Sequence, residues 1–338
     1  MAKHKIACVV NSDADFSLLE QQLTGLDYEM DVHICKSDGE TIEAVRGADV
    51  IINQGVKMPR EVIEEIDTAQ AIVSNGHGFD RIDHNAATDQ GVMLINSASV
   101  GTEEVSNHTI MMLLACAKEL GRLDRLVRAG GWTPEARAQV HSLVPIDGQV
   151  LGLVALGNIG RTTARKAKVF GLEVIAYDPY LPPWIAREYR VELVSSLEEL
   201  ARRSDFVSMH VPLNDETTKM VGESFFKTMK PTAYFVNTCR GPTVDERALI
   251  EALQSGEIAG AGIDVFEQEP TPADNALLKL ENVILSPHTA GTSVRSRTIA
   301  YTQLGQETAR VLRGTWPMSL VNPEVRAKIS ARSLAAQH

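Results

Sequence analysis

The stretch VLGLVALGNIGRTTARKAKVFGLEVIAYD, residues 150–178, decides the fold. An apolar run at 150–154 is followed by the turn Ala-Leu-Gly-Asn-Ile-Gly at 155–160 and then by a segment of helical composition. A second apolar run leads directly to Asp178. A strand, a glycine-containing turn and a helix in this order mark the position of the dinucleotide fingerprint G-x-G-x-x-G, in which Ala155 replaces the first glycine. The stretch therefore predicts a dinucleotide-binding unit.

The residue types in this turn suit a pyrophosphate. Gly157 lets the backbone approach the phosphates, Gly160 lets the helix pack on the strand, and the helix N-terminus attracts negative charge. Asp178 can accept hydrogen bonds from the ribose hydroxyls and would repel a 2′-phosphate, which favours NAD over NADP, although it could instead be a turn residue before Pro179. The expected cofactor contacts in this segment are Leu156, Gly157, Asn158, Ile159, Gly160 and Asp178.

Apolar runs recur on both sides of this segment at the spacing of strands that alternate with helices. The runs are 6–10, 50–52, 71–73 and 92–95, and then 150–154, 174–177, 206–210, 234–237, 262–265 and 283–285. Strands separated by helices predict parallel sheets. The fold class is therefore α/β, with two Rossmann-like domains, doubly wound parallel sheets and an interdomain cleft.

Two helical patterns set the domain boundaries. One long helix is predicted from Thr102 to Ala129, ended by Gly130 and Gly131, and a final helix is predicted over 294–313. The chain end should return to the first domain. The expected domains are 1–100 plus 292–338, which binds substrate in a flavodoxin-like fold, and 101–291, which binds NAD.

Composition bounds the remaining possibilities. The chain has 338 residues, 44% of them hydrophobic and 23% charged, and a net charge of −11, which disfavours nucleic acid as a partner. Its four cysteines are widely spaced and indicate neither a disulfide framework nor a metal site. No apolar run is long enough for a membrane helix or a signal peptide. We expect a cytoplasmic protein with no membrane, metal or nucleic-acid partner.

Three later segments place polar residues just after apolar strands. They are VNTCRG at 236–241, DVFEQEP at 264–270 and SPHTAG at 286–291. Ligands of doubly wound sheets bind beyond the carboxyl ends of the strands. Arg240, Asp264, Glu269 and His288 are therefore expected to converge on one crevice, although each alone could be a structural residue.

With GHGFD at 76–80, these segments make nearly the whole chain resemble the D-isomer-specific 2-hydroxyacid dehydrogenase family, in its phosphoglycerate dehydrogenase and C-terminal-binding-protein branch. The resemblance implies NAD-dependent interconversion of a small D-2-hydroxy acid and its 2-oxo acid. It makes His288 the acid/base, Glu269 its partner, and Arg240 the group that binds the substrate carboxylate and carbonyl. It also implies a homodimer, with the long helix and the following loop as interface.

Further site residues follow from the same resemblance. Additional cofactor contacts are expected at His210, Val211, Pro212, Thr217, Thr238, Cys239, Asp264 and Gly291. Asp264 would lie near the nicotinamide carboxamide, or could cap a turn, and Cys239 is either a packing residue or a reactive thiol. Substrate contacts are expected at Asn53, Asn75, Gly76, His77 and Gly78, together with Arg240 and His288. Arg81 stands where the family usually has Asn.

Reduction of a 2-oxo acid requires side chains of the types found at His288, Glu269 and Arg240. Reduction of a 2-oxo acid places a hydride on carbon and a proton on oxygen, and histidine is the side chain best suited to give that proton near neutrality. A carboxylate such as Glu269 would hold the imidazole in one tautomer and favour its protonated form. The planar fork of Arg240 matches a carboxylate.

Three alternatives remain open. Phosphoglycerate dehydrogenases commonly carry arginines where this chain has Asn53-Gln54-Gly55, although Lys57 or Arg60 could substitute. The second alternative is a C-terminal-binding corepressor, which this chain resembles at residues 177–180. Those corepressors typically carry a tryptophan shortly after the catalytic histidine, whereas this chain has Thr-Ala-Gly at 289–291. A regulator that lost catalysis through Ala155 is the third. Formate dehydrogenases have Gln in place of Glu269.

Overall fold

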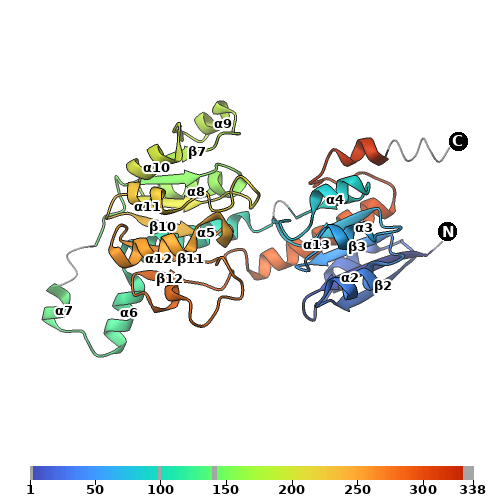
Figure 1. Cartoon of the computed structure of the whole chain (residues 1–338), viewed down its shortest axis with the longest axis horizontal. Helices are drawn as coiled ribbons and strands as arrows, with labels where there is room; N and C mark the ends of the chain where they lie inside the picture. Colours follow the sequence, from blue (N-terminus) through green and yellow to red (C-terminus); the bar gives the residue numbers. More distant parts are fainter. Residues whose placement is uncertain (1–2, 98–99, 139–142, 330–338) are drawn as a thin grey trace. The chain divides into compact units, whose positions relative to one another are not determined.

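The computed structural model describes residues 3–97, 100–138 and 143–329. The chain forms two compact units (Figure 1). The first unit contains Met1–Gly101 and Ser293–His338, and the second contains Thr102–Thr292. Because the chain returns to the first unit after Thr292, that unit is built from both ends of the sequence.

The first unit is built on a five-stranded parallel sheet in the order β2-β1-β3-β4-β5. The strands are β1 (His4–Val10), β2 (Tyr28–Ile34), β3 (Val50–Gln54), β4 (Ala71–Ser74) and β5 (Met93–Ile95). The four predicted runs are all strands, because strands covered on both faces read as continuous apolar sequence. The sequence missed β2, an edge strand whose polar residues Glu29 and Asp31 lie in the partly exposed segment YEMDVHI.

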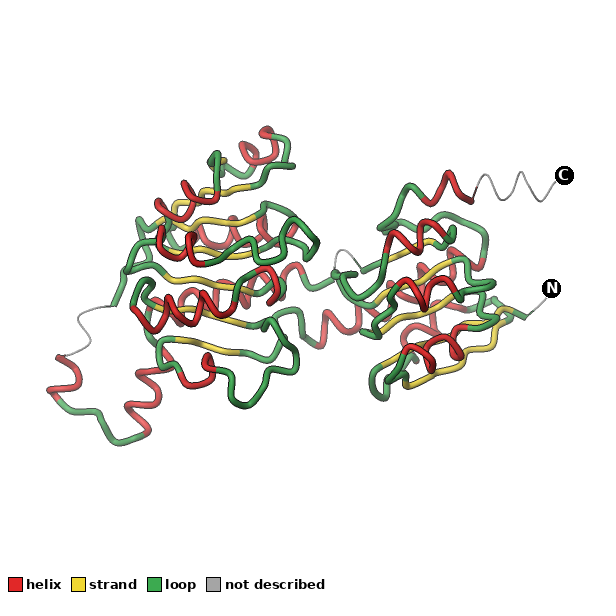
Figure 2. Tube along the Cα trace, in the orientation of Figure 1, coloured by secondary structure: helices red, strands yellow, loops and turns green. Residues whose placement is uncertain are grey.

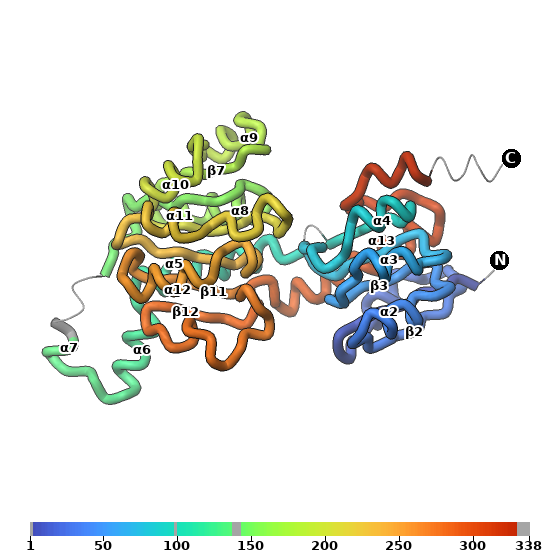
Figure 3. Tube along the Cα trace, in the orientation of Figure 1, coloured from blue at the N-terminus to red at the C-terminus, as the bar shows by residue number. Residues whose placement is uncertain are grey.

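Helices cover both faces of this sheet (Figure 2). They are α1 (Ser17–Glu20), η1 (Gln21–Leu23), α2 (Asp38–Val45), α3 (Arg60–Glu64), α4 (His84–Asp89) and α13 (Val294–Leu312). The last helix, near the red end of the chain in Figure 3, packs on α1 and places Tyr301 and Leu304 in the core beside strand residues such as Ile6. A capping box of Ser293 and Ser296 begins this helix.

The second unit contains a seven-stranded parallel sheet in the order β12-β11-β10-β9-β6-β7-β8. Its strands are β6 (Val150–Val154), β7 (Glu173–Tyr177), β8 (Glu192–Leu193), β9 (Phe206–Met209), β10 (Tyr234–Asn237), β11 (Gly260–Ile263) and β12 (Val283–Leu285). The strand order reverses at β6, which lies between β9 and β7. This reversal is the topological switch point at which doubly wound sheets bind ligands. The six predicted strands are present, and the two-residue edge strand β8 was missed.

The helices of the second unit alternate with its strands (Figure 2). They are α5 (Thr102–Ala117), α6 (Leu120–Arg128), α7 (Pro134–Ala138), α8 (Asn158–Val169), α9 (Pro183–Glu188), α10 (Leu197–Arg203), α11 (Glu223–Thr228), η2 (Gly241–Thr243), α12 (Glu246–Ser255) and η3 (Ala276–Lys279). Within the described ranges, no helix combines the length and apolar composition needed to cross a membrane.

The single long helix predicted over 102–129 is wrong. The helix is interrupted between α5 and α6, where Glu119 has a left-handed backbone with φ 48°. Residues Met112 and Leu113 of α5 are fully buried against the sheet, whereas no residue of α6 is buried. Apolar periodicity continues across the break, so the pattern did not indicate that only α5 belongs to the core.

Candidate active site

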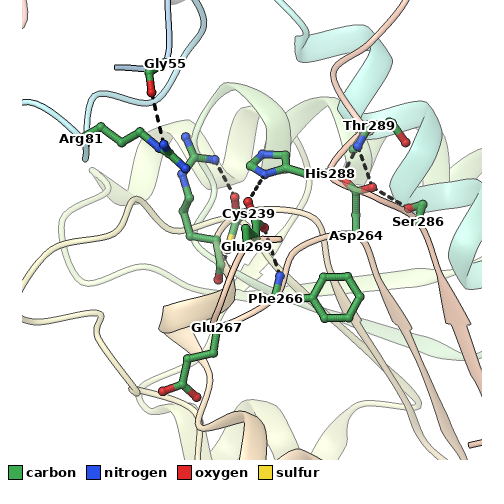
Figure 4. Close-up of polar contacts among 12 residues, drawn as sticks. Gly55, Arg81, Cys239, Asp264, Phe266, Glu267, Glu269, Ser286, His288 and Thr289 are labelled. Carbon is green, nitrogen blue, oxygen red and sulfur yellow. Dashed lines mark hydrogen bonds and ion pairs between the residues drawn. The ribbon is translucent and has the colours of Figure 1, made fainter. Parts of the chain in front are cut away.

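His288 and Glu269, the acid/base pair predicted from the sequence, are in contact. The imidazole Nδ1 of His288 lies 2.7 Å from a carboxylate oxygen of Glu269 (Figure 4). The other Glu269 oxygen accepts a hydrogen bond from the backbone N–H of Phe266, at 3.1 Å. Burial alone would raise the pKa of Glu269, but the hydrogen bond and charge of His288, the Phe266 N–H and the charge of Arg240 together hold that pKa below its usual value. The His288 side chain is 45% exposed, so a substrate can reach it.

Asp264 holds the loop that carries His288. Its carboxylate, which is fully buried, accepts hydrogen bonds from the backbone N–H groups of Thr289 and Ala290, each at 2.9 Å, and from the hydroxyl of Ser286 (Figure 4). The backbone carbonyl of Asp264 accepts from the His288 N–H at 2.7 Å. His288 itself has φ 52°, a left-handed conformation that is unfavourable for a residue with a side chain. The contacts of Asp264 stabilise this conformation and so orient the imidazole.

The turn that carries Arg240 is fixed by its own backbone. The Arg240 carbonyl accepts from the Thr243 hydroxyl at 2.7 Å and from the Asn237 amide at 3.1 Å. A Cβ on Gly241 would lie 1.8 Å from the Phe266 carbonyl oxygen, so only glycine allows this turn to pack on the segment before Glu269. The guanidinium donates to the Cys239 carbonyl at 2.7 Å. This packing brings the segments of Arg240 and Glu269 together.

Cys239 and Thr238 precede Arg240 in the same turn. Burial raises the pKa of the Cys239 thiol, which opposes thiolate formation and favours the packing interpretation over a reactive thiol. The hydroxyl of Thr238 is buried and lies 2.9 Å from the hydroxyl of Thr109 on α5. The side chains of both residues therefore have partners within the protein.

The fingerprint turn has an unusual backbone at its first position. Ala155 has φ 73°, the left-handed region in which glycine is ordinarily found. Gly157 caps the N-terminus of α8 without a side-chain hydrogen bond, and a Cβ built on it would meet no atom within 4 Å. A Cβ on Gly160 would lie 2.5 Å from the Ala155 carbonyl oxygen. The turn is thus closed on the Gly160 side and open at Gly157, where the first-turn N–H groups of Asn158 and Ile159 can face an anion.

Asp178 ties the fingerprint turn to the loop after β7. One carboxylate oxygen accepts from the Leu156 N–H at 2.9 Å, and the other accepts from the Tyr180 N–H at 3.1 Å. Both contacts leave lone pairs on the oxygens, since a carboxylate offers about four acceptor positions. The carboxylate at the end of β7 therefore fits the ribose of a dinucleotide, and with Gly157 it makes the residues present suit a nicotinamide dinucleotide.

The loop after β9 flanks the same turn. Burial lowers the pKa of the His210 imidazole to about 4, and its Nε2 lies 3.1 Å from the Ser208 hydroxyl. His210 is therefore neutral at physiological pH. The hydroxyl of Thr217 donates to the Pro212 carbonyl at 2.6 Å, and its N–H donates to the Asn214 side chain at 3.0 Å. Thr217 shapes this loop, and Val211 is nearly buried within it.

Known proteins resemble this chain over most of its length. The model of the "D-isomer specific 2-hydroxyacid dehydrogenase, NAD binding domain" matches residues 110–290. A glyoxylate reductase of Korarchaeum cryptofilum is 40% identical over 285 residues, which cover 84% of this chain and 86% of that protein. The chain belongs to the D-isomer-specific 2-hydroxyacid dehydrogenase family. The predicted family and the class of nicotinamide-dependent oxidoreductase are therefore confirmed.

Two other family members show the range of the match. A D-3-phosphoglycerate dehydrogenase of Methanocaldococcus jannaschii is 36% identical over 295 residues, but the match covers 87% of this chain and only 55% of that protein. The holo structure of Rhodotorula graminis D-mandelate dehydrogenase superimposes with a TM-score of 0.85 at 27% identity, covering 95% of this chain and 98% of that one. The predicted α/β fold with Rossmann-like domains is confirmed by this match and by the two parallel sheets.

In the first unit of this dehydrogenase, the side chain of Asn53 is bonded within the protein. Its side chain is 1% exposed, and its amide both donates to and accepts from the backbone of Val56, at 2.9 and 3.1 Å. Asn53 therefore shapes the turn after β3 through its amide. Its carbonyl accepts from the Asn75 N–H at 2.9 Å, which joins this turn to the loop after β4.

The loop after β4 carries the remaining substrate residues predicted from the family. Gly76 has φ 99°, which only glycine adopts readily, and its carbonyl accepts from the Ser97 N–H. The carbonyl of His77 accepts from the Asn96 side chain at 2.7 Å, and the His77 residue is exposed. Gly78 is half-buried. These contacts order the loop.

The two arginines near these turns differ in their partners. Arg60, which the sequence offered as a phosphate-binding substitute, forms ion pairs with Glu64, Asp83 and Asp89. Arg81, the departure from the family pattern, donates to the Gly55 carbonyl at 3.2 Å (Figure 4). Arg81 therefore supports the turn after β3, and Arg60 is neutralised by acidic neighbours.

The sequence missed two residues of the His288 support. His108 of α5 places its Nε2 2.9 Å from the Ser286 hydroxyl and 3.7 Å from an Asp264 oxygen. His108 lies on a helix whose pattern indicated only packing, so its contact with Asp264 had no signal in the sequence. Ser286 lies in the recognised segment SPHTAG, two residues before His288. Its hydroxyl, so close to His288 in sequence, was the signal that could have identified it as a supporting residue.

The two ends of the fingerprint turn give opposite expectations for substitution. Ala155→Gly should raise the free energy of unfolding by about 0.5–1 kcal/mol, because it relieves the positive φ. Gly157→Ala should leave that free energy within about 0.5 kcal/mol of wild type, since the methyl meets nothing in the protein. The same methyl should weaken NADH binding by about tenfold or more. Urea denaturation and NADH fluorescence titration measure both, and wild-type NADH affinity in Gly157→Ala would place the pyrophosphate elsewhere.

Proposed function

We propose that this chain is an NAD-preferring dehydrogenase that interconverts a small 2-oxo acid of the glyoxylate type and the corresponding D-2-hydroxy acid. The observation that carries the proposal is the 2.7 Å contact between Nδ1 of the exposed His288 and the carboxylate of Glu269. The glyoxylate reductase relatives support the substrate class, since the one from Korarchaeum cryptofilum matches over most of both chains.

The residues divide the work of reduction. Glu269 accepts from Nδ1, which leaves Nε2 of the protonated His288 to give a proton to the carbonyl oxygen of the substrate. Arg240 binds the substrate carboxylate and polarises the carbonyl through its planar, permanently charged fork. When bound, the nicotinamide dinucleotide supplies the hydride. In the oxidation direction, neutral His288 takes the hydroxyl proton, and the Glu269 carboxylate stabilises the imidazolium that forms.

Phosphoglycerate oxidation is the second candidate, because one relative is named for it. The charges around the turn after β3 do not favour binding of a phosphorylated substrate. Three carboxylates surround Arg60, and the amide of Asn53 is used by the backbone. A phosphate dianion therefore finds a less favourable environment in this turn than an unsubstituted oxo acid does.

Further parts of the proposal concern organisation. We assign substrate binding to the domain formed by 1–100 plus 292–338, and cofactor binding to 101–291. The homodimer predicted from the family would use α6 and the segment that follows it, where Leu120, Val127 and Trp132 are exposed. Residues 139–142 of that segment lie outside the described residues. We propose a cytoplasmic enzyme.

The first test is a substrate and cofactor screen on the purified chain. Glyoxylate with NADH should give a higher kcat/KM than 3-phosphohydroxypyruvate with NADH or glyoxylate with NADPH. Asp178→Ala should narrow the preference for NADH, because hydrogen bonds to the ribose and repulsion of the 2′-phosphate are both lost. A wild-type enzyme with higher kcat/KM for NADPH would reject the cofactor assignment, and one that reduces only the phosphorylated acid would reject the substrate class.

A further inference from the structure

Tyr180 and Glu216 join two loops that are distant in sequence. Tyr180 lies just after β7 and Asp178, and Glu216 lies in the loop after β9. The Tyr180 hydroxyl donates a hydrogen bond to the Glu216 carboxylate. This hydrogen bond and the charge of Glu216 raise the pKa of Tyr180, so the hydroxyl stays a donor throughout the physiological range.

The strand order shows what this pair spans. In the second sheet β6 lies between β9 and β7. A contact between the loop after β9 and the loop after β7 therefore passes across the carboxyl end of β6, where the fingerprint turn begins. This end of β6 is the switch point of the sheet, at which a dinucleotide binds with its pyrophosphate on the turn and its adenosine toward the acid at the end of the next strand.

Both ends of the pair are anchored. The Tyr180 N–H donates to Asp178, which also accepts from the Leu156 N–H of the fingerprint turn. On the other side, Asn214 and Thr217 exchange hydrogen bonds between side chain and backbone in both directions, at 2.9 and 3.0 Å, and hold the turn that presents Glu216. Tyr180 is 76% exposed, so its ring can contact a ligand without any change in the core.

We propose that Tyr180 and Glu216 form a clasp over the adenosine half of the bound dinucleotide. The aromatic ring retains the adenosine, and the Glu216 carboxylate adds a second negative charge beside Asp178 that disfavours a 2′-phosphate. The inference rests on the proposed use of NAD and assigns two residues to it beyond the fingerprint and its acid.

Two conservative variants test the clasp in the full-length chain. Tyr180→Phe keeps the ring and removes the donor, so NADH and ADP-ribose should both bind about threefold to tenfold more weakly, with faster dissociation. Glu216→Gln keeps the shape and removes the charge, so the ratio of the NADPH and NADH dissociation constants should fall by about fivefold. Calorimetry gives the dissociation constants, and stopped-flow NADH fluorescence gives the dissociation rate.

Matched controls separate the clasp from general effects. Tyr28→Phe in β2 and Glu198→Gln in α10 make the same chemical changes away from these loops, and both should bind NADH as wild type does. Unchanged ADP-ribose affinity in Tyr180→Phe, or an unchanged cofactor ratio in Glu216→Gln, would overturn the clasp while leaving NAD use intact. Failure of the wild-type chain to bind any nicotinamide dinucleotide would overturn the proposed function and the clasp together.

Discussion

Replacing His288 by alanine should lower kcat for oxo-acid reduction by about 10²–10⁴-fold, because the substrate oxygen then lacks its proton donor. The side chain is 45% exposed and its partner is Glu269, so the substitution should not disturb the core. NADH affinity and the free energy of unfolding should remain near those of wild type. The matched control is His33→Ala in the edge strand β2, which changes the same residue type in the first unit.

Glu269→Gln tests the pairing by its effect on pH dependence. The interaction with His288 lowers the pKa of Glu269, and by reciprocity the ionised Glu269 favours the protonated imidazole. The glutamine keeps the shape and an acceptor but removes the negative charge that stabilises a positive charge on the imidazole. The alkaline limb of the reduction profile should therefore move to lower pH.

Steady-state kinetics with one oxo acid from pH 5 to 9 measures both effects. Near-wild-type kcat in His288→Ala would show that the proton comes from another group, and the assignment of this histidine as acid/base would have to be abandoned. A Glu269→Gln profile that keeps its limbs and loses only amplitude would mean that Glu269 orients the imidazole without affecting its charge.

The strands that are buried on both faces were predictable, because such strands consist of continuous apolar runs. The edge strand β2 was not, since one edge of a strand and part of its surface face solvent and permit residues such as Glu29 and Asp31. The break between helices α5 and α6 at Glu119 was also not predictable from the sequence. Apolar periodicity records that a segment can be helical, but not that two helices meet at a residue with left-handed backbone.

The candidate site was likewise only partly predictable from the sequence. The segments with Arg240, Glu269 and His288 were found because motif and strand-end position agree. The contacts that hold those residues were not found, because they depend on backbone geometry. Asn53 looked like a ligand contact, yet its amide closes the turn to Val56. Asp264 could be read from sequence either as a cofactor contact or as a turn cap, and both alternatives use the same residue type at the same position.

The contacts of Asp264 make it a positioning residue for His288. Asp264→Asn exchanges one acceptor oxygen for an NH₂ group, which then faces the N–H of Thr289 or Ala290 in a fully buried position. A buried donor without an acceptor costs about 1–3 kcal/mol, so the free energy of unfolding should fall by that amount. Released from this support, the left-handed backbone at His288 can relax and misplace the imidazole, and kcat should fall by about 10–100-fold.

NADH affinity then separates the two roles of Asp264. If the carboxylate only holds the His288 loop, the dissociation constant for NADH should stay within about twofold of wild type while kcat and stability fall. If it also binds the nicotinamide carboxamide, NADH affinity must fall with them, and the positioning role alone is rejected. The control is Asp245→Asn, the N-cap of α12, where the amide oxygen can still accept from the Ala248 N–H and stability should hardly change. Ser286→Ala removes one donor to the same carboxylate without orphaning a backbone group, so its losses should be the smaller of the two.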